Sequence, residues 1–316
     1  MSRRAVPDIP AVPCSQPSAF EEPDSIRKEY VHLGRSDMVL LTSWRRTEDG
    51  EFSLSAKWPA PGSGLSYDPR MLTQTVRQSG LVIAHAAYGA PLDDHTLLNY
   101  FDLTVTPGFE VPPGLPCDFT VEVTVKNAKK RGKKVSSLDM EFRILRDGDL
   151  TARADSEFGW LSTRVYQRLR GEHLAFEWNS WPLPAPVDPR TVGRHTPADV
   201  VLAAGKHALH WQLRNDVDNV VLYDHPVDHV PGLALMEAAD QAARAAVYPA
   251  PFEATTVTST FERYTELDRP CWVEAEILPA GPGEASVLVT ATQDGNTAFR
   301  SRLSGPCGQD LPGLTG

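Results

Sequence analysis

Two stretches decide how this 316-residue chain folds: PRMLTQTVRQSGLVIAHAAY at residues 69–88 and GLALMEAADQAARAAV at residues 232–247. Both stretches read as helices, and the first begins on a proline and ends before Gly89 and Pro91. After Gly80 the first helix is apolar or small around most of its circumference. Such a helix must be buried on several sides, which happens when a β-sheet curls around it.

Strand-like runs surround each helix. In the N-terminal half they lie at residues 29–33, 38–44, 51–58, 96–106, 118–126, 135–145 and 151–162. In the C-terminal half they lie at residues 199–203, 207–214, 219–222, 252–264, 271–278, 285–293 and 297–303. Each half therefore has short strands, one buried helix and a meander of about four strands, which predicts a duplicated α+β unit.

A proline-rich stretch, WPLPAPVDPRTVGRHTP at residues 181–197, joins the two units and can form neither a helix nor a central strand. We expect a flexible tail over residues 1–25, the first unit over 26–175, a linker over 176–197, the second unit over 198–305 and a flexible tail over 306–316.

The polar positions of the two helices support the duplication. They align at a constant offset of 163 residues, which pairs Gln74 with Glu237, Arg77 with Asp240, and Gln78 with Gln241. The repeat kept its pattern while its polar side chains diverged.

Composition excludes several classes of protein. A formal net charge of −10 disfavours a general nucleic-acid binder, and no apolar run approaches the roughly 18 residues of a membrane span. The N-terminus lacks the apolar region of a secretory signal. The cysteines are widely spaced and form no CxxC pair, which suits a reducing cytoplasm and argues against a zinc site: Cys14, Cys117, Cys271 and Cys307.

One basic cluster stands out against the acidic background. It consists of Lys126, Lys129, Lys130, Arg131, Lys133 and Lys134, interrupted by Gly132. A solvated hairpin tip between two strands explains it most simply. The alternative is a dock for an acidic partner, such as an acyl carrier protein or the phosphates of a coenzyme A thioester.

The chemically richest stretch is YDHPVDHVPGLALMEAADQA at residues 223–242. It places four ionisable side chains directly before the second helix: Asp224, His225, Asp228 and His229. The N–H groups of Gly232 and Leu233 at the helix N-terminus can hold a thioester carbonyl as it becomes an oxyanion.

Glu237 is a candidate general base, because desolvation in a mostly apolar helix favours proton uptake by a carboxylate. His229 or His225 could shuttle the proton. The structural alternative is a turn whose aspartates cap the helix and whose histidines pack. We expect no metal, since a proline separates the two histidines from a shared helix face, and no cofactor, since P-loop and Rossmann patterns are missing.

Arg77 and Gln78 lie just before the first helix becomes apolar, with His85 about two turns further on. A buried arginine normally pairs with a carboxylate or a phosphate. Both remain open here, and the internal partners we consider for Arg77 are Asp68 and Glu237.

The stretch at residues 223–242, together with YDPRMLTQTVRQSGLVIAHAAYGAPL at 67–92, resembles the two signature blocks of the A-factor biosynthesis hotdog family. The resemblance covers residues 31–303. It implies a tandem hotdog, in which each repeat is a curved antiparallel sheet wrapped around a long buried helix. The pattern of Pro231, Gly232, Glu237 and Gln241 is also similar to hotdog hydroxyacyl dehydratases.

Membership implies transfer of a β-ketoacyl group from an acyl carrier protein or coenzyme A thioester to the hydroxyl of dihydroxyacetone phosphate. The phosphorylated ester then closes to a butenolide, a precursor of γ-butyrolactone, butenolide or furan signalling molecules. On this basis Glu237 with His229 deprotonates the triose hydroxyl, assisted by Asp228 or His225. The substrate and its phosphate would be bound by Arg77, Gln78, Gln74 and Gln241.

The chain departs from the family pattern at Gln74, where a glutamate is usual, and at Asp240, where an arginine is usual. Glu237 on one helix and Arg77 on the other suggest a single composite site at the repeat interface. The alternatives are another hotdog thioester enzyme, namely a dehydratase or thioesterase, and a non-catalytic hotdog that binds a ligand. Two hotdogs in one chain imitate a hotdog dimer, so we expect a monomer or a homodimer.

Overall fold

The computed structural model describes residues 24–60, 66–132, 134–175 and 177–308. Most of the two predicted tails, including Cys14, and Lys133 of the basic cluster lie outside these residues. Three cysteines in the described part, Cys117, Cys271 and Cys307, are buried free thiols. No helix in that part is long and apolar enough to cross a membrane.

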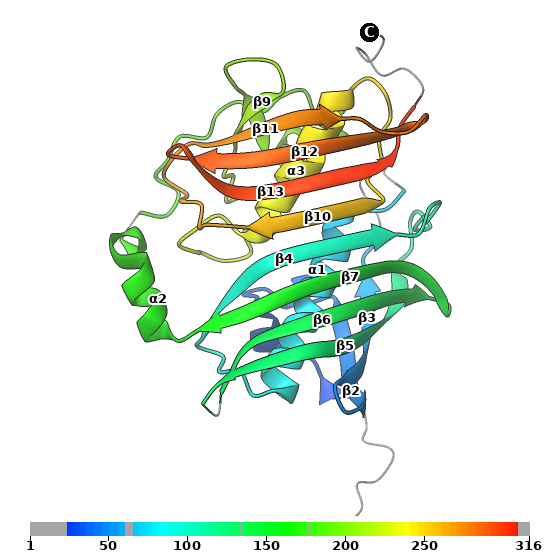
Figure 1. Ribbon diagram of the computed structural model, residues 1–316, viewed down its shortest axis with the longest axis vertical. Coiled ribbons are helices and arrows are strands. Elements are labelled where there is room, and N and C mark those ends of the chain that lie inside the picture. Colours follow the sequence, from blue (N-terminus) through cyan, green and yellow to red (C-terminus); the bar gives the residue numbers. More distant parts are fainter. Residues whose placement is uncertain (1–23, 61–65, 133, 176, 309–316) are drawn as a thin grey trace, which may run out of the picture.

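The described strands form one antiparallel sheet with thirteen members (Figure 1). The first half supplies β1 (Asp24–Ser25), β2 (Leu41–Glu48), β3 (Glu51–Trp58), β4 (His95–Val105), β5 (Cys117–Arg131), β6 (Lys134–Arg146) and β7 (Asp149–Leu161). The second half supplies β8 (Leu202–Ala204), β9 (His210–Leu213), β10 (Thr256–Phe261), β11 (Cys271–Leu278), β12 (Glu284–Gln293) and β13 (Asn296–Pro306).

The sheet has a mirrored order that confirms the duplication. Inward from the short edge strand β1, the first half runs β2-β3-β5-β6-β7-β4, and from its own edge the second half runs β8-β9-β11-β12-β13-β10. The halves join where β4 pairs with β10, from Thr104 opposite Thr256 to Tyr100 opposite Thr260. One continuous sheet therefore carries both repeats, as a tandem hotdog requires.

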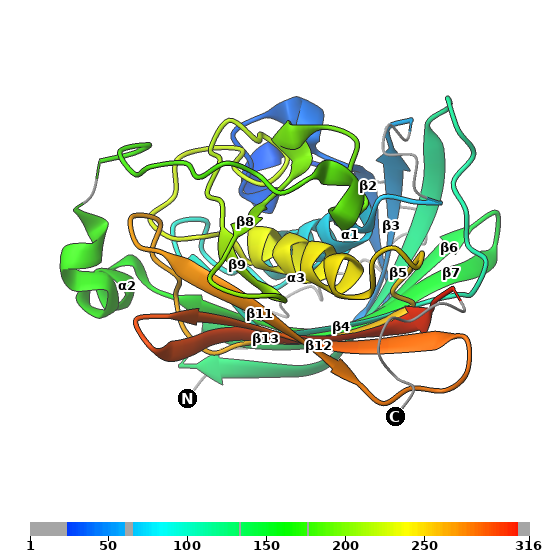
Figure 2. The same cartoon turned by 90° about the horizontal axis from the view of Figure 1, so that it is seen from above.

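Two long helices lie on the same face of this sheet, one from each half (Figure 2). They are α1 (Pro69–Val82), which continues as a π-helical turn over Ile83–Ala87, and α3 (Gly232–Val247). Asp68 caps α1 by accepting a hydrogen bond from the Arg70 N–H at 2.9 Å. A Cβ at Gly80 would lie 2.7 Å from the Phe158 ring, so glycine lets α1 approach β7 closely.

The alternating pattern of the strands places apolar side chains against the helices. Leu138, Met140 and Phe142 of β6 are fully buried, as are Leu72 and Val76 of α1. Burying each such side chain contributes about 1.5–3 kcal/mol. This packing fixes the helices on which the polar residues stand.

Two predicted strands are not strands. Residues 29–31 lie in the 3₁₀ turn Lys28–Val31. Residues 219–222 lie in a turn region that is closed by a hydrogen bond from the Tyr223 N–H to the Asn219 carbonyl. Both runs are short, and tertiary contacts of the flanking chain override a preference of four or five residues.

The segment between the units is more structured than predicted. An unpredicted helix, α2 (Thr163–Arg170), follows β7, and the proline-rich linker contains a 3₁₀ turn at Pro189–Val192. Pro186 also forms an isolated bridge with Ala203. Proline at the first position of a helical turn needs no N–H donor, which explains the turn at Pro189.

The basic cluster lies at the turn between β5 and β6, as the simpler interpretation predicted. Lys126 forms an ion pair with Glu141, and Lys129 pairs with Glu157 of β7 at 2.9 Å. Gly132 supplies the positive φ of 66° at the turn.

Candidate active site

The loop from Asp224 to His229, called the DH loop below, leads into α3 and is held by the first half of the chain. Asp224 accepts hydrogen bonds from the N–H groups of Gly34 and Arg35, the latter at 3.2 Å. Asp228 accepts from Tyr166, which lies on α2. The DH loop therefore lies at the interface of the two repeats.

Asp228 and His229 form a hydrogen-bonded dyad. His229 Nδ1 lies 2.8 Å from Asp228 Oδ1, and the carboxylate also accepts from the Tyr166 hydroxyl at 2.6 and 2.7 Å. Hydrogen bonds from His229 and Tyr166 outweigh burial and hold the pKa of Asp228 well below its usual value. An ionised Asp228 fixes the N–H on Nδ1 of His229 and leaves Nε2 as a proton acceptor.

Arg170 of α2 holds Asp228 of this dyad in place. Its guanidinium donates to Asp228 Oδ2 at 3.0 Å, to the Asp228 carbonyl at 2.8 Å, and to both oxygens of Glu266 at 2.7 Å. The guanidinium also lies 4.6 Å from the centre of the Tyr264 ring, which packs edge-on against His229. The dyad is thus positioned by two fully engaged side chains of α2, Tyr166 and Arg170.

His95 at the start of β4 completes this side of the site. Its ring stacks on Tyr166 with centroids 3.6 Å apart and an angle of 3° between the planes. Burial lowers the pKa of His95, while the negative charge of Asp228 opposes the shift. His95 is therefore a neutral imidazole within electrostatic range of the dyad.

Asp224 and His225 form a second, more exposed dyad. His225 Nδ1 lies 3.1 Å from Asp224 Oδ2, and the His225 side chain is 42% exposed, compared with 27% for His229. The Asp224 carboxylate also accepts hydrogen bonds from the backbone N–H groups of Gly34 and Arg35. This dyad anchors the N-terminal segment.

Arg77 on α1 lies close to the Asp224 dyad and has no carboxylate within 4 Å in the described part of the chain. Its only described hydrogen bond goes to the Val31 carbonyl at 3.1 Å. Burial lowers the pKa of its guanidinium to about 10, and the charge of Asp224 opposes the shift. Arg77 remains a cation at neutral pH with unused donors, which suits an anionic ligand.

Two stacked histidines lie beside Arg77. The Nε2 atoms of His32 and His85 are 2.8 Å apart, and His85 Nδ1 lies 2.8 Å from the Ala90 carbonyl. A carbonyl only accepts, so His85 donates from Nδ1 and accepts at Nε2 from His32. Burial lowers the pKa of both rings, that of His32 to about 3, because His85 and Arg77 add to the effect of burial.

The N-terminus of α3 supplies free backbone donors. Pro231 provides no side-chain cap, and among the described residues we find no acceptor for the N–H groups of Gly232 and Leu233. A Cβ at Gly232 would lie 3.1 Å from the Phe261 ring and 3.7 Å from Leu98. The N-terminus of α3 therefore lies against the sheet near the junction of β4 and β10. Gly232 follows His229 by three residues in the sequence.

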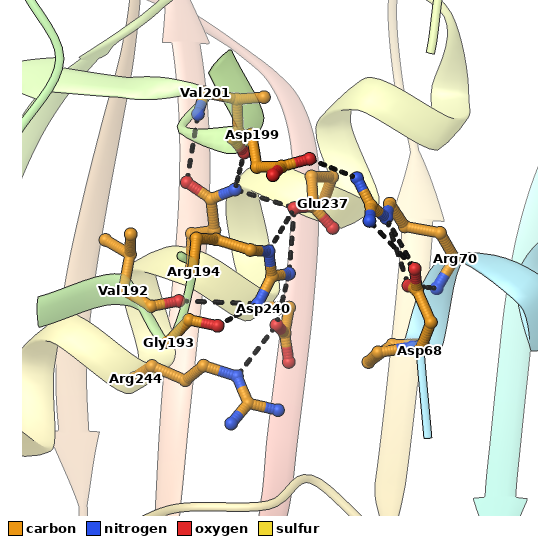
Figure 3. Close-up of polar contacts among 12 residues, drawn as sticks. Asp68, Arg70, Val192, Gly193, Arg194, Asp199, Val201, Glu237, Asp240 and Arg244 are labelled. Atoms are coloured by element: carbon orange, nitrogen blue, oxygen red, sulfur yellow. Dashed lines mark hydrogen bonds and ion pairs between the residues drawn. The ribbon is translucent and has the colours of Figure 1, made fainter. Parts of the chain in front are cut away.

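Glu237 lies in a different polar network, further along α3 (Figure 3). It is 3% exposed, and its Oε1 accepts from Arg194 Nε at 2.8 Å and from Gln241 Nε2 at 2.6 Å. Arg194 also pairs with Asp240 at 2.9 Å, and Asp240 pairs with Arg244 at 2.9 Å. The other oxygen of Glu237, Oε2, has no hydrogen-bond partner within the described residues.

The two halves place an arginine at equivalent points but take it from different elements. Arg77 donates to the carbonyl of Val31 at 3.1 Å, and Arg194 donates to the carbonyl of Val192 at 3.4 Å. Val31 and Val192 each end a matching 3₁₀ turn. With Asp240 in place of an arginine on α3, Arg194 from the linker takes over this position.

A cavity lies between α1 and α3 over the junction of the sheet. Its lining comes from both halves: Tyr67, Pro69, Arg70, Thr73, Leu103, Leu233, Met236, Glu237, Asp240, Ala254, Val257 and Leu303. Leu233, Met236 and Asp240 form one stripe of α3 that begins beside the free amides at its N-terminus. The cavity is mostly apolar and becomes polar at Arg70, Glu237 and Asp240.

The expected composite of Glu237 and Arg77 is divided in the structure. Glu237 lies near Arg70, whose pKa it helps to raise, whereas Arg77 lies near Asp224. No described contact joins Glu237 to His229. The internal partners considered for Arg77 are also not used, because Asp68 pairs with Arg70 at 2.8 Å and Glu237 pairs with Arg194.

The glutamines assigned to substrate binding hold the fold together. Gln78 accepts from the Leu40 N–H at 2.8 Å and donates to the Met38 carbonyl at 3.0 Å. Gln241 repeats this pattern with Val201 at 2.9 Å and Asp199 at 2.7 Å. Gln74 is buried and its Oε1 lacks a described partner, so it alone of the three has unused capacity.

Several residues of the site were missed in the sequence: His32, His95, Tyr166, Arg170 and Arg194. Each reaches the site from a distant segment, as the separation of 58 positions between Arg170 and Asp228 illustrates. The one available signal was the pair Tyr166 and Arg170, whose spacing of four places them on one face of a helix. Among the described residues, no group of three histidine, cysteine or acidic side chains could hold a metal ion.

Comparison with known proteins identifies a family. A model of the A-factor biosynthesis hotdog domain matches residues 14–162 and 179–305. The 2-oxo-3-(phosphooxy)propyl 3-oxoalkanoate synthase of Streptomyces virginiae is 40% identical, over 87% of this chain and 95% of its own. The synthase of the same name from Streptomyces coelicolor is 36% identical, over 87% and 90%. A putative oleoyl thioesterase structure from Lactobacillus plantarum matches with a TM-score of 0.49 and 14% identity, over 83% of this chain and 97% of that one.

Proposed function

The chain belongs to the A-factor biosynthesis hotdog domain family, and from this membership we propose that it is an acyltransferase that joins a β-ketoacyl thioester to dihydroxyacetone phosphate. The product is a 2-oxo-3-(phosphooxy)propyl 3-oxoalkanoate, as the names of the relatives state. Closure of this ester gives a butenolide precursor of a butyrolactone-, butenolide- or furan-type signalling molecule. The observation that carries the proposal is the Asp228–His229 dyad beside the free amides of α3.

His229 acts as the general base in this proposal. Its Nε2 takes the proton from the triose hydroxyl, whose oxygen attacks the thioester carbonyl. The N–H groups of Gly232 and Leu233 stabilise the tetrahedral oxyanion. The carbon–sulfur bond then breaks, and the imidazolium of His229 returns the proton to the departing thiolate. Asp228 stabilises the imidazolium between these two steps.

Arg77 binds the triose phosphate. Its unused donors and the lack of a described carboxylate partner support this role, because a phosphate can satisfy the fork of a guanidinium. His225 pairs with Asp224, whose charge also acts on Arg77, so His225 can donate to the phosphate once the ligand is bound. The negative charge of Asp224 partly offsets the charge of Arg77 before the phosphate binds.

The acyl chain lies in the cavity between α1 and α3. The cavity lining starts at Leu233, next to the proposed oxyanion site, and continues along α3 past Met236. Glu237 lies five residues after Gly232, or about 7.5 Å along the helix axis. The Arg194 network therefore closes the far end of the cavity, and Glu237 shapes the acyl site instead of acting as the base with His229.

The donor is a thioester on a carrier protein or on coenzyme A, and both donors occur in the cytoplasm, as does the triose phosphate. We therefore assign the enzyme to the cytoplasm, as a monomer or homodimer that needs no cofactor. A thioesterase or dehydratase is less well supported, because neither reaction needs a phosphate-binding cation such as Arg77.

Mass spectrometry of the product tests the proposal. The protein is incubated with a β-ketoacyl thioester and dihydroxyacetone phosphate, and we expect the phosphorylated ester or its butenolide. The His229→Gln variant should make neither at a comparable rate, whereas the surface variant Lys57→Glu should match the wild type. Free β-keto acid as the sole product of the wild type would contradict the proposal.

A further inference from the structure

The outer face of α2 exposes large apolar side chains to solvent. Tyr166 and Arg170 point inward to Asp228, but Val165 and Leu169 are 42% and 58% exposed. These two apolar residues lie four apart and therefore form one stripe on the helix. Exposed large apolar side chains that lie together mark interaction surfaces.

The same outer face is basic. Arg164 and Arg168 are exposed, have no described ion pair and flank the apolar stripe, and the sequence of α2 contains no acidic residue. The first acidic residue after the helix in the sequence is Glu172. On a chain with a net charge of −10, this helix is a local exception.

The basic turn between β5 and β6 lies at the same end of the sheet as α2. Ser137 of β6 pairs with Gly159 of β7, so Lys134 at the start of β6 and Ser162, the N-cap of α2, are each three residues beyond this pair. Lys129 reaches Glu157 of β7 at 2.9 Å. Figure 1 shows α2 beyond the end of β7, on the side where β5 and β6 turn. The exposed basic residues of the turn and of α2 that have no described ion pair are Lys130, Arg131, Lys134, Arg164 and Arg168.

We infer that this surface, called the α2 face below and made of Arg164, Val165, Arg168, Leu169 and the β5–β6 turn, docks an acidic carrier protein that delivers the acyl thioester. Charge complementarity favours an acidic partner, and the apolar stripe favours a folded protein over a nucleotide. The inner face of the same helix contacts Asp228 through Tyr166 and Arg170, so a carrier bound to α2 lies one helix away from the dyad.

The inference rests on the proposed function for the identity of the thioester, but it can be tested by binding alone. The ligand is an acidic acyl carrier protein with its phosphopantetheine arm carrying a non-hydrolysable β-ketoacyl amide. The R164E/R168E variant reverses two exposed charges and spares Tyr166 and Arg170. Its matched control is Lys57→Glu, which lies opposite Asp118 at the other end of β5.

We expect R164E/R168E to weaken carrier binding by about tenfold or more at low salt, and Leu169→Asp to weaken it by a similar factor. The control should bind within about twofold of the wild type, and added salt should weaken wild-type binding. Folding of each variant is checked by its thermal midpoint. Unchanged carrier binding by both α2 variants overturns the inference.

Turnover separates this inference from the proposed function. With a pantetheine thioester as the small donor, R164E/R168E should keep the wild-type kcat/KM within about twofold, while kcat/KM with the carrier-bound donor falls about tenfold or more. Equal losses with the carrier-bound donor and a coenzyme A thioester would assign the surface to phosphates and overturn the carrier assignment. A wild-type protein that binds the carrier but makes no ester would refute the proposed function and leave the docking surface standing.

Discussion

Asp228→Asn provides a sharp test of how the site works. The carboxylate lies 2.8 Å from His229 Nδ1 and accepts from Tyr166 and Arg170 as well. Asparagine keeps the size of the side chain but removes the charge that stabilises an imidazolium. It also allows the tautomer of His229 in which Nε2 carries the proton and cannot accept one.

The magnitude follows from the geometry. Opposite unit charges about 4 Å apart attract by about 4 kcal/mol at an effective dielectric of about 20, and about 1.36 kcal/mol corresponds to tenfold in rate. Arg170 already neutralises part of the Asp228 charge, so the loss should be smaller than the full attraction. We expect kcat to fall by about 100-fold to 1000-fold with little change in KM.

The chain contains its own control, because Asp224 stands before His225 as Asp228 stands before His229. Asp224→Asn keeps an oxygen for the N–H groups of Gly34 and Arg35, and we expect kcat within about threefold of the wild type. Steady-state kinetics with saturating thioester measures both variants. A folded Asp228→Asn protein with at least a third of the wild-type kcat would refute the role of the dyad, as would equal losses in both variants.

Four further perturbations have expected outcomes. Arg77→Leu should lower kcat/KM for dihydroxyacetone phosphate by about 10-fold to 100-fold but leave kcat/KM for unphosphorylated dihydroxyacetone within about threefold of the wild type. Equal losses with both acceptors would show that Arg77 does not bind the phosphate. Met236→Trp narrows the acyl cavity, so kcat/KM for long acyl chains should fall about tenfold or more while short chains are spared, and a uniform loss in a chain-length series would contradict this. Arg194→Met leaves Glu237 and Asp240 buried without their shared cation, which should lower the free energy of unfolding in urea by about 3–5 kcal/mol, whereas an unchanged midpoint would show that the pairs contribute nothing. His32 has a folded-state pKa of about 3 against an ordinary 6.5, so its contribution to stability is complete above pH 6.5 and is lost as the pH falls toward 3. Between pH 6.5 and 5 the free energy of unfolding of the wild type should therefore fall by up to about 1.4 kcal/mol more per pH unit than that of His32→Gln. Equal falls in the two proteins would exclude His32 as the cause.

The fold could be predicted from the sequence because the duplication repeats its own signals. The two helices, the constant offset of their polar residues and the meander after each helix all appear in the mirrored order of the sheet. The boundaries of β3 and β11 match the predicted runs at residues 51–58 and 271–278. Period-two alternation over eight residues is a strong local signal.

The site could be predicted only in part, because its parts come from distant segments. The DH loop and the start of α3 were recognisable, since acidic residues, histidines and a glycine before a helix form a local pattern. The partner of Glu237 was not, because Arg194 comes from a linker whose prolines give no sign of a buried cation. Arg170 was missed for the same reason: its ion pairs with Asp228 and Glu266 depend on the path of the chain after β7.

The pairing of Arg77 with Glu237 failed for a geometric reason. Arg70 and Arg77 are two turns apart on α1, about 10.5 Å along its axis, and Arg70 is the one that lies near Glu237. A spacing of seven residues puts both arginines on the same face of α1, but this spacing does not determine which of them lies near α3. The antiparallel pairing of β4 with β10 sets how the two repeats, and with them the two helices, lie against each other.

The central claim is that the thioester is transferred to dihydroxyacetone phosphate at the DH loop and not to water. The most direct measurement is the rate of thiol release from a β-ketoacyl thioester with and without dihydroxyacetone phosphate, followed by a thiol-reactive dye. We predict that release requires the triose phosphate, equals the rate of ester formation and is lost in Asp228→Asn. Thiol release at the same rate without dihydroxyacetone phosphate, with free β-keto acid as the product, would contradict the claim.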